Sequence, residues 1–194
     1  SLAIAGIRIR VVGIENFRGT GSKVVIANHT SVLDVPLVAA LGPEWPLCLA
    51  KAELRWFPVF NLMWWSMGQV FVDRKDPSRA GESLERIIAA TRAEARTGIL
   101  APEGTRSVDG NIGKFKLGAF RIAVATGAPI VPIVIRGGGN LMPKGQWWAN
   151  PGEVIIEVKP PIPTVNWTNE TIREHTLATE RQYRDWIAAS GLSS

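Results

Sequence analysis

Apolar and polar residues follow patterns along the chain that predict β-strands and α-helices in alternation. Residues 7–14 (IRIRVVGI) alternate apolar and basic positions, as a strand with one exposed face does. Later apolar runs lack this alternation and predict further strands, of which residues 23–28 and 129–135 are of the type buried on both faces. These further predicted strands are residues 23–28, 47–51, 70–74, 98–101, 129–135 and 153–159.

Helix signals lie between the predicted strands. One helix begins near Ser31, where Ser31 and Asp34 have the Ser-x-x-Asp spacing of a capping box. A second begins at Pro77, with Asp76 as its cap, and has one apolar face. The remaining predicted helices are residues 53–67, residues 115–126 and a C-terminal helix from about Thr171, with Glu174 in a second capping box.

This order of elements predicts an α/β fold: a mainly parallel (mixed) sheet of about seven strands, covered by helices on both faces. A chain of 194 residues, 46% of them apolar, is enough for one core, and we expect a single domain over residues 1–194. Ligands of such sheets bind where loops leave the carboxyl ends of strands. Three polar loops fall at such ends: NHTS (28–31), DRKD (73–76) and PEGTRS (102–107).

Cysteine and histidine are scarce, which limits the chemistry of the chain. A single cysteine excludes an internal disulfide, and two histidines without metal-ligand spacing argue against a structural zinc site. Cys48 lies in the apolar run PLCLAK, which predicts a buried thiol without a reactive role.

The net charge of +5 and the pI near 9.8 indicate an anionic partner: phosphate, nucleic acid or an acidic membrane surface. Lysines and arginines are scattered, without a basic patch that aromatic residues interrupt, which disfavours nucleic acid. Residues 58–72 carry no charge and include Trp64 and Trp65. A membrane span needs about 20 residues, so this segment predicts either a buried helix or one that lies in a membrane interface.

His29 and Asp34 form a candidate catalytic pair. A carboxylate that fixes the imidazole tautomer makes histidine a general base near neutral pH, worth roughly 10² to 10⁴ in rate. Five residues on a regular helix would place the two side chains about 140° apart, so His29 must precede the helix that contains Asp34. The alternative is that Asp34 only caps the helix and that His29 is only exposed.

The loop PEGTRS has the parts of an anion site. Gly104 makes backbone N–H groups accessible, and the planar guanidinium of Arg106 can bind phosphate through two hydrogen bonds. Arg74 and Lys116 can add charge. The alternative is an ordinary basic loop. The segment is not a Walker loop, because it lacks the spacing of that motif. The RGGGN segment (136–140) lacks the dinucleotide-binding pattern and predicts a flexible turn.

Four segments together resemble a known family. NHTSVLD, GQVFVDR, PEGTRS and APIVPIVI occur in the order and spacing of the motifs of the glycerolipid acyltransferases, with FKLG between the last two. The chain is most similar to the 1-acyl-sn-glycerol-3-phosphate (lysophosphatidate) acyltransferase branch, from about Ile7 to Lys159. Ala101, where the family commonly has Phe, and Asn61, where glycine is frequent, depart from it.

The resemblance implies a role for individual residues. His29 would be the general base and Asp34 its partner. Pro129 and Pro132 would help to shape the acyl-donor side. The substrate-binding residues that it implies are Arg74 of the second motif, which Gly68 and Phe71 also match, and Glu103, Gly104, Thr105 and Arg106 of the third. Lys116, which can add charge to this site, is a further candidate.

The activity that the resemblance implies is transfer of a fatty acyl group from acyl-CoA or acyl-carrier protein to the sn-2 hydroxyl of lysophosphatidate. No cofactor or metal is expected beyond this co-substrate. The expected partners are the lysophospholipid, the acyl donor and a membrane surface, at the cytoplasmic face of the inner membrane if the source is bacterial. An N-terminal membrane anchor, usual in the family, is expected to be absent from this sequence. The alternatives are acylation of another lysolipid, such as lyso-ornithine lipid, and a non-catalytic acyl-lipid binding protein.

Overall fold

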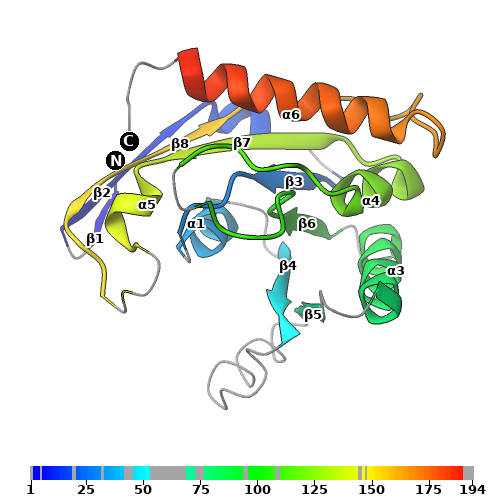
Figure 1. Cartoon of the computed structure of the whole chain (residues 1–194), viewed down its shortest axis with the longest axis horizontal. Coiled ribbons are helices and arrows are strands. Elements are labelled where there is room, and N and C mark those ends of the chain that lie inside the picture. The colour runs from blue at the N-terminus through cyan, green and yellow to red at the C-terminus, as the bar shows by residue number, and fades with distance from the viewer. Residues whose placement is uncertain are drawn as a thin grey trace.

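The computed structural model describes residues 2–4, 6–18, 21–31, 33–41, 46–52, 69–72, 77–93, 96–107, 110–143, 146 and 148–189. Within them, strands form one sheet in the order β1-β2-β8-β7-β3-β6-β4-β5 (Figure 1). The strands are β1 (Leu2–Ile4), β2 (Ile7–Val12), β3 (Val24–Ala27), β4 (Pro46–Lys51), β5 (Val70–Val72), β6 (Thr97–Leu100), β7 (Ile130–Arg136) and β8 (Gly152–Val158).

Strand pairing confirms a mixed, mainly parallel sheet. The pairs β2–β8, β3–β6, β3–β7, β4–β5 and β4–β6 are parallel, and β1–β2 and β7–β8 are antiparallel. The described sheet has eight strands, one more than the sequence predicts. The additional strand is β1, which has three residues and is too short to show a period of its own.

The helices agree with the prediction at most positions. They are the 3-10 helix η1 (Ile14–Phe17) and the α-helices α1 (Asp34–Leu41), α3 (Pro77–Ala93), α4 (Gly118–Thr126), α5 (Gly138–Leu141) and α6 (Ile172–Ala189). The helix predicted over residues 53–67, with its tryptophans, and the DRKD loop lie outside the described residues. Every helix in the described part of the chain is too short or too polar to span a lipid bilayer.

Two local predictions are wrong. The RGGGN segment, predicted as a flexible turn, contains the helical turn α5, because Leu141 at its end is buried in the core at 2% exposure. At the start of α6 the reciprocal capping bonds join Thr168 and Thr171, which exchange N–H to Oγ1 hydrogen bonds of 3.0 and 3.4 Å. Glu174 takes no part in them.

The two faces of the sheet carry separate cores, which confirms helices on both faces. Along β3, Val24 and Ile26 pack with residues of α3, α4 and α6, whereas Val25 and Ala27 pack with residues of η1, α1 and α5. Strand β7 alternates in the same way. In Figure 1, α6 lies along one face of the sheet and α1 and α5 along the other. This alternation is why buried parallel strands have no polar face.

The connections reverse direction at the centre of the sheet. From β3 the chain passes through α1 to β4, toward the β5 edge, and from β6 it passes through α4 to β7, in the opposite direction. Since such crossovers are right-handed, the two connecting helices lie on opposite faces. The neighbouring strands β3 and β6 therefore form a topological switch point, where ligands bind in sheets of this kind.

Candidate active site

His29 and Asp34 meet at the carboxyl end of β3. His29 lies in the turn after the strand and Asp34 is the first residue of α1. The distance from His29 Nδ1 to Asp34 Oδ2 is 3.1 Å, and the aspartate side chain is 1% exposed against 17% for the histidine. In the tautomer with its proton on Nδ1, this N–H donates a hydrogen bond to the carboxylate, and Nε2 is left as the acceptor nitrogen of the ring. This is the geometry that a histidine base needs.

One carboxylate oxygen of Asp34 makes hydrogen bonds to three consecutive residues of the turn after β3. Besides the imidazole, Oδ2 accepts the N–H groups of Thr30, at 2.6 Å, and of Ser31, at 2.7 Å. Ser31 Oγ accepts from the Leu33 N–H at 3.3 Å, which completes a capping arrangement at the start of α1. The same carboxylate therefore both takes part in the cap and contacts His29, and catalysis by the pair stays a prediction.

Glu103 joins the loop after β6 to the histidine turn. Its carboxylate accepts the His29 N–H at 3.1 Å and the Gly113 N–H at 2.9 Å, and the side chain is buried. The Ser107 N–H donates to the His29 carbonyl at 2.7 Å, so the loop binds the histidine main chain on both sides. Burial raises the pKa of the Glu103 carboxyl, while the two N–H groups oppose that rise. The contact of Glu103 with substrate stays a prediction.

The strands beneath His29 are bridged by two side chains that the sequence does not reveal as important. The Asn28 carboxamide accepts from the Ile135 N–H at 2.7 Å and donates to the Ile135 carbonyl at 2.8 Å. The Tyr183 hydroxyl, from α6, donates to the Ile26 carbonyl at 2.6 Å and accepts from the Ile133 N–H at 3.0 Å. Both bridges join β3 to β7. They fix the end of the strand from which His29 projects.

The predicted anion-binding residues that the structure describes lie on one turn or over it. Gly104 has a φ of +72°, which favours glycine, and a Cβ built on it would lie 2.9 Å from Lys116 Nζ. The Lys116 side chain therefore crosses the turn that contains exposed Thr105 and half-buried Arg106. Phosphate binding by these residues stays a prediction. Arg74 and Gly68 lie outside the described residues.

The prolines of the fourth motif lie at and within β7. The Pro129 carbonyl accepts from the Val24 N–H at 3.0 Å, and the Pro132 carbonyl accepts from the Lys159 N–H at 2.9 Å. Pro132 has no N–H to offer in return, and it stands where the pairing of β7 changes from Val158 opposite Ile133 to Ile162 opposite Ile130. Between these two pairs β7 advances by three residues and the opposite segment, from Val158 to Ile162, by four, as at a β-bulge. The interrupted ladder accommodates a proline within an inner strand.

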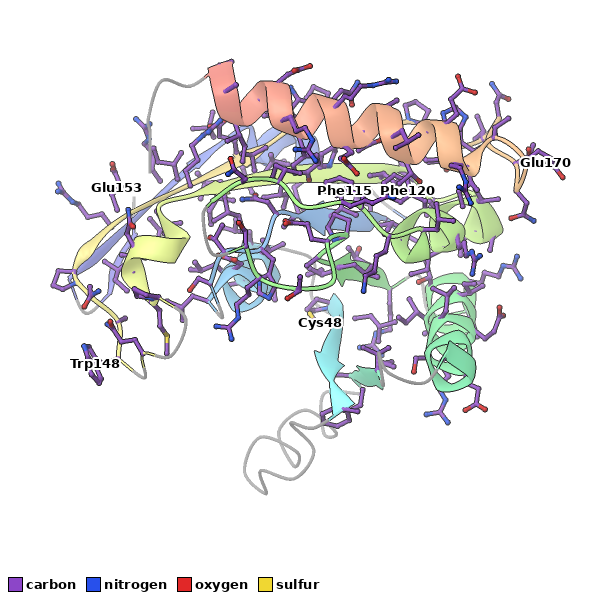
Figure 2. All side chains as sticks on the ribbon, viewed as in Figure 1. Cys48, Phe115, Phe120, Trp148, Glu153 and Glu170 are labelled. Atoms are coloured by element: carbon purple, nitrogen blue, oxygen red, sulfur yellow. The ribbon has the colours of Figure 1, made fainter. Side chains whose placement is uncertain are left out.

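Cys48 is buried, as predicted, and Figure 2 labels it on β4. Burial raises the pKa of its thiol to about 12, so the reactive thiolate is suppressed. No three histidine, cysteine, aspartate or glutamate side chains come together as a possible metal site within the described residues.

Comparison with known proteins connects this geometry to a family. The profile of the family described as "Acyltransferase" matches residues 8–136. The 1-acyl-sn-glycerol-3-phosphate acyltransferase of Cocos nucifera is 32% identical over 187 residues, which are 96% of this chain and 60% of the plant protein. The alpha enzyme of that name from Mus musculus is 32% identical over 168 residues, covering 86% and 59%. The chain spans about 60% of the length of these curated relatives.

A solved structure agrees with the sequence comparison. The crystal structure of the 1-acyl-sn-glycerophosphate (LPA) acyltransferase PlsC from Thermotoga maritima superposes with a TM-score of 0.78 at 32% identity, covering 94% of this chain and 73% of that one. Residues 8–136, which the family profile matches, contain the histidine turn, the loop after β6 and most of the sheet that positions them. The motifs, the similarity to relatives and the fold therefore agree that the chain belongs to the acyltransferase family.

Proposed function

We propose that this chain transfers a fatty acyl group from a thioester, acyl-CoA or acyl-carrier protein, to the sn-2 hydroxyl of lysophosphatidate. The observation that carries the proposal is the His29–Asp34 pair, 3.1 Å apart at the topological switch point of the sheet. Relatives named 1-acyl-sn-glycerol-3-phosphate acyltransferases support the substrate.

The proposed mechanism uses His29 as a general base. Its Nδ1 keeps its proton, hydrogen-bonded to the Asp34 carboxylate, and Nε2 takes the proton of the sn-2 hydroxyl as that oxygen attacks the thioester carbonyl carbon. A C–O bond forms, the tetrahedral intermediate collapses and the C–S bond breaks. The imidazolium then returns the proton to the departing sulfur, so no covalent acyl-enzyme is formed. Buried Asp34 stabilises the imidazolium while it exists.

A phosphorylated acceptor fits the loop after β6 better than an acceptor without phosphate. Arg106 and Lys116 are cations on or over the turn at Gly104, and the +72° φ of that glycine gives the turn its shape. Guanidinium and ammonium groups bind phosphate through charge-assisted hydrogen bonds. Glu103 is then a residue that shapes the turn through the His29 and Gly113 N–H groups.

The proposed acyl transfer takes place at a lipid surface, because both substrates carry long acyl chains. Trp148, 68% exposed, lies between α5 and β8 and projects from the molecule in Figure 2. Exposed indoles favour the headgroup region of a bilayer. The loop that contains Trp148 starts beside the site, where the Ser31 hydroxyl lies 3.4 Å from the Met142 carbonyl oxygen.

The experiment measures thiol release from palmitoyl-CoA in mixed micelles, with and without lysophosphatidate. His29→Ala should lower acceptor-dependent release by roughly 10²- to 10⁴-fold. The matched control is His175→Ala, which removes the only other histidine of the chain and should keep wild-type turnover.

The outcomes separate the alternatives. Release that is equal without acceptor would indicate a thioesterase. Thiol release with lyso-ornithine lipid but not with lysophosphatidate would show that the acceptor is the lipid without a phosphate. If His29→Ala and wild type are equally active, the proposed base is wrong. If neither the CoA nor the carrier-protein thioester is consumed with either acceptor, while both lipids bind, the chain is an acyl-lipid binding protein.

A further inference from the structure

The carboxylate of Asp34 is bound on one side only. All its hydrogen bonds, from His29 Nδ1 and from the N–H groups of Thr30 and Ser31, go to Oδ2. The other oxygen, Oδ1, is buried and has no hydrogen-bond partner in the described part of the chain. A buried acceptor without a partner is uncommon and calls for an explanation.

The surface that faces Oδ1 is the first turn of α5. A Cβ built on Gly138 would lie 2.6 Å from Asp34 Oδ1 and 3.1 Å from Thr30 Oγ1. Real Cβ atoms essentially never come within 3.0 Å of another heavy atom. The Gly138 main chain therefore approaches the carboxylate more closely than any other residue type would allow.

The three consecutive glycines of this segment have different structural requirements. Gly137 has a φ of +79°, so its conformation favours glycine. Gly138 has no positive φ, and its requirement is space beside Asp34. Gly139 has neither requirement, since the nearest heavy atom to its Cβ position is Thr30 Cβ at 3.6 Å, an ordinary contact.

We propose that Gly138 is a positioning residue for the catalytic pair. Its missing side chain lets α5 lie against the Asp34 carboxylate and keeps Oδ2 turned toward His29. A methyl group at position 138 would push Oδ1 outward and rotate Oδ2 away from the imidazole. Helix α5 cannot easily yield instead, because Leu141 is buried in the core and its carbonyl accepts the Asn150 N–H at 2.7 Å.

The direct test is the tautomer of His29 in Gly138→Ala, with Gly139→Ala as the matched control. Nitrogen chemical shifts of ¹⁵N-labelled histidine show which ring nitrogen carries the proton, and the chain has only two histidines, so His175 serves as internal reference. In wild type and in Gly139→Ala, His29 should carry the proton on Nδ1. In Gly138→Ala the proton should shift toward Nε2, with His175 unchanged.

A second test uses folding and remains informative even if Gly138→Ala is poorly stable. The substitution should lower the melting temperature of the wild type by on the order of 5 °C. In an Asp34→Ala background the methyl group has space, so the same substitution should cause much less loss. A loss that is equally large in both backgrounds would show that Gly138 does not act through Asp34.

The kinetic test rests on the proposed function, whereas the other two do not. A displacement of this size costs roughly 10² in rate, so kcat of Gly138→Ala should fall about 10- to 100-fold with little change in KM for lysophosphatidate. Absence of turnover in the wild type would overturn the proposed function and leave the tautomer test valid. A wild-type tautomer together with wild-type kcat in Gly138→Ala would overturn the positioning role.

Discussion

Replacing Tyr183 with Phe would remove one oxygen atom from the interior and leave the ring in place. That oxygen donates to the Ile26 carbonyl at 2.6 Å and accepts from the Ile133 N–H at 3.0 Å, and the residue is fully buried. Each buried main-chain group left without a partner costs about 1 to 3 kcal/mol. Partial closure of the two strands would recover some of this loss, so we expect the free energy of unfolding to fall by about 3 kcal/mol.

Urea unfolding followed by tryptophan fluorescence would measure this loss, and thermal unfolding should show a melting temperature lower by roughly 6 to 12 °C. The matched control is Thr176→Val, which also removes a buried hydroxyl from α6. Thr176 Oγ1 donates to the Ile172 carbonyl four residues earlier, at 2.8 Å. That carbonyl already accepts a helical N–H, so the control should lose less than about 1 kcal/mol.

Equal losses in the two variants would refute the reasoning, because they would show that a hydroxyl between strands matters no more than one along a helix. A loss below about 0.5 kcal/mol for Tyr183→Phe, within the range of ordinary surface substitutions, would also refute it. The strands would then pair directly once the oxygen is gone.

Three further predictions concern other parts of the structure. Because folding raises the pKa of Cys48 from 9.0 to about 12, the unfolded chain loses that proton first. The contribution of Cys48 to the free energy of unfolding, measured by urea titration, should therefore be constant below pH 9 and fall between pH 9 and 12 by roughly 1.4 kcal/mol per pH unit, and Cys48→Ala should remove this part of the slope. Burial also raises the pKa of Tyr183 well above 10, which adds a loss of the same sign above pH 10. Gly104→Ala should raise KM for lysophosphatidate, whereas Gly110→Ala, at a similar φ of +75° with open space around its Cβ, should cost about 1 to 2 kcal/mol in stability and leave KM unchanged. Asn28→Asp keeps the shape of the side chain but turns a carboxylate toward a main-chain carbonyl, and thermal unfolding should show a loss of about 2 to 4 kcal/mol.

Much of the fold could be predicted because buried parallel strands have an unmistakable pattern. Strands β3 and β7 are uninterrupted apolar runs, and the structure uses both faces of each. The contact of His29 with Asp34 could also be expected, because their spacing allows it when His29 precedes the helix and because the surrounding motif resembles that of a known family. These features depend on local sequence alone.

The supports of the site could not be predicted, because they depend on distant partners. Tyr183 is 157 residues from the carbonyl that it binds, and Asn28 is 107 residues from Ile135. Nothing near either residue reveals its partner. Gly137, Gly138 and Gly139 are three consecutive glycines, so the sequence alone does not distinguish them. The packing of α5 against Asp34 gives Gly138 a requirement that its neighbours do not share.

The hydroxyl bridge between β3 and β7 also has a consequence for synthesis of the chain on the ribosome. Strand β3 emerges early and β7 much later, yet the oxygen that joins them belongs to α6, which is translated after both. A nascent chain that has completed its sheet but not this helix lacks the bridge beneath His29. The turn that contains the histidine is therefore expected to become fully ordered only after α6 has emerged. In a chain that stalls before Tyr183, the hydroxyl hydrogen bonds that join β3 to β7 beneath His29 would be missing.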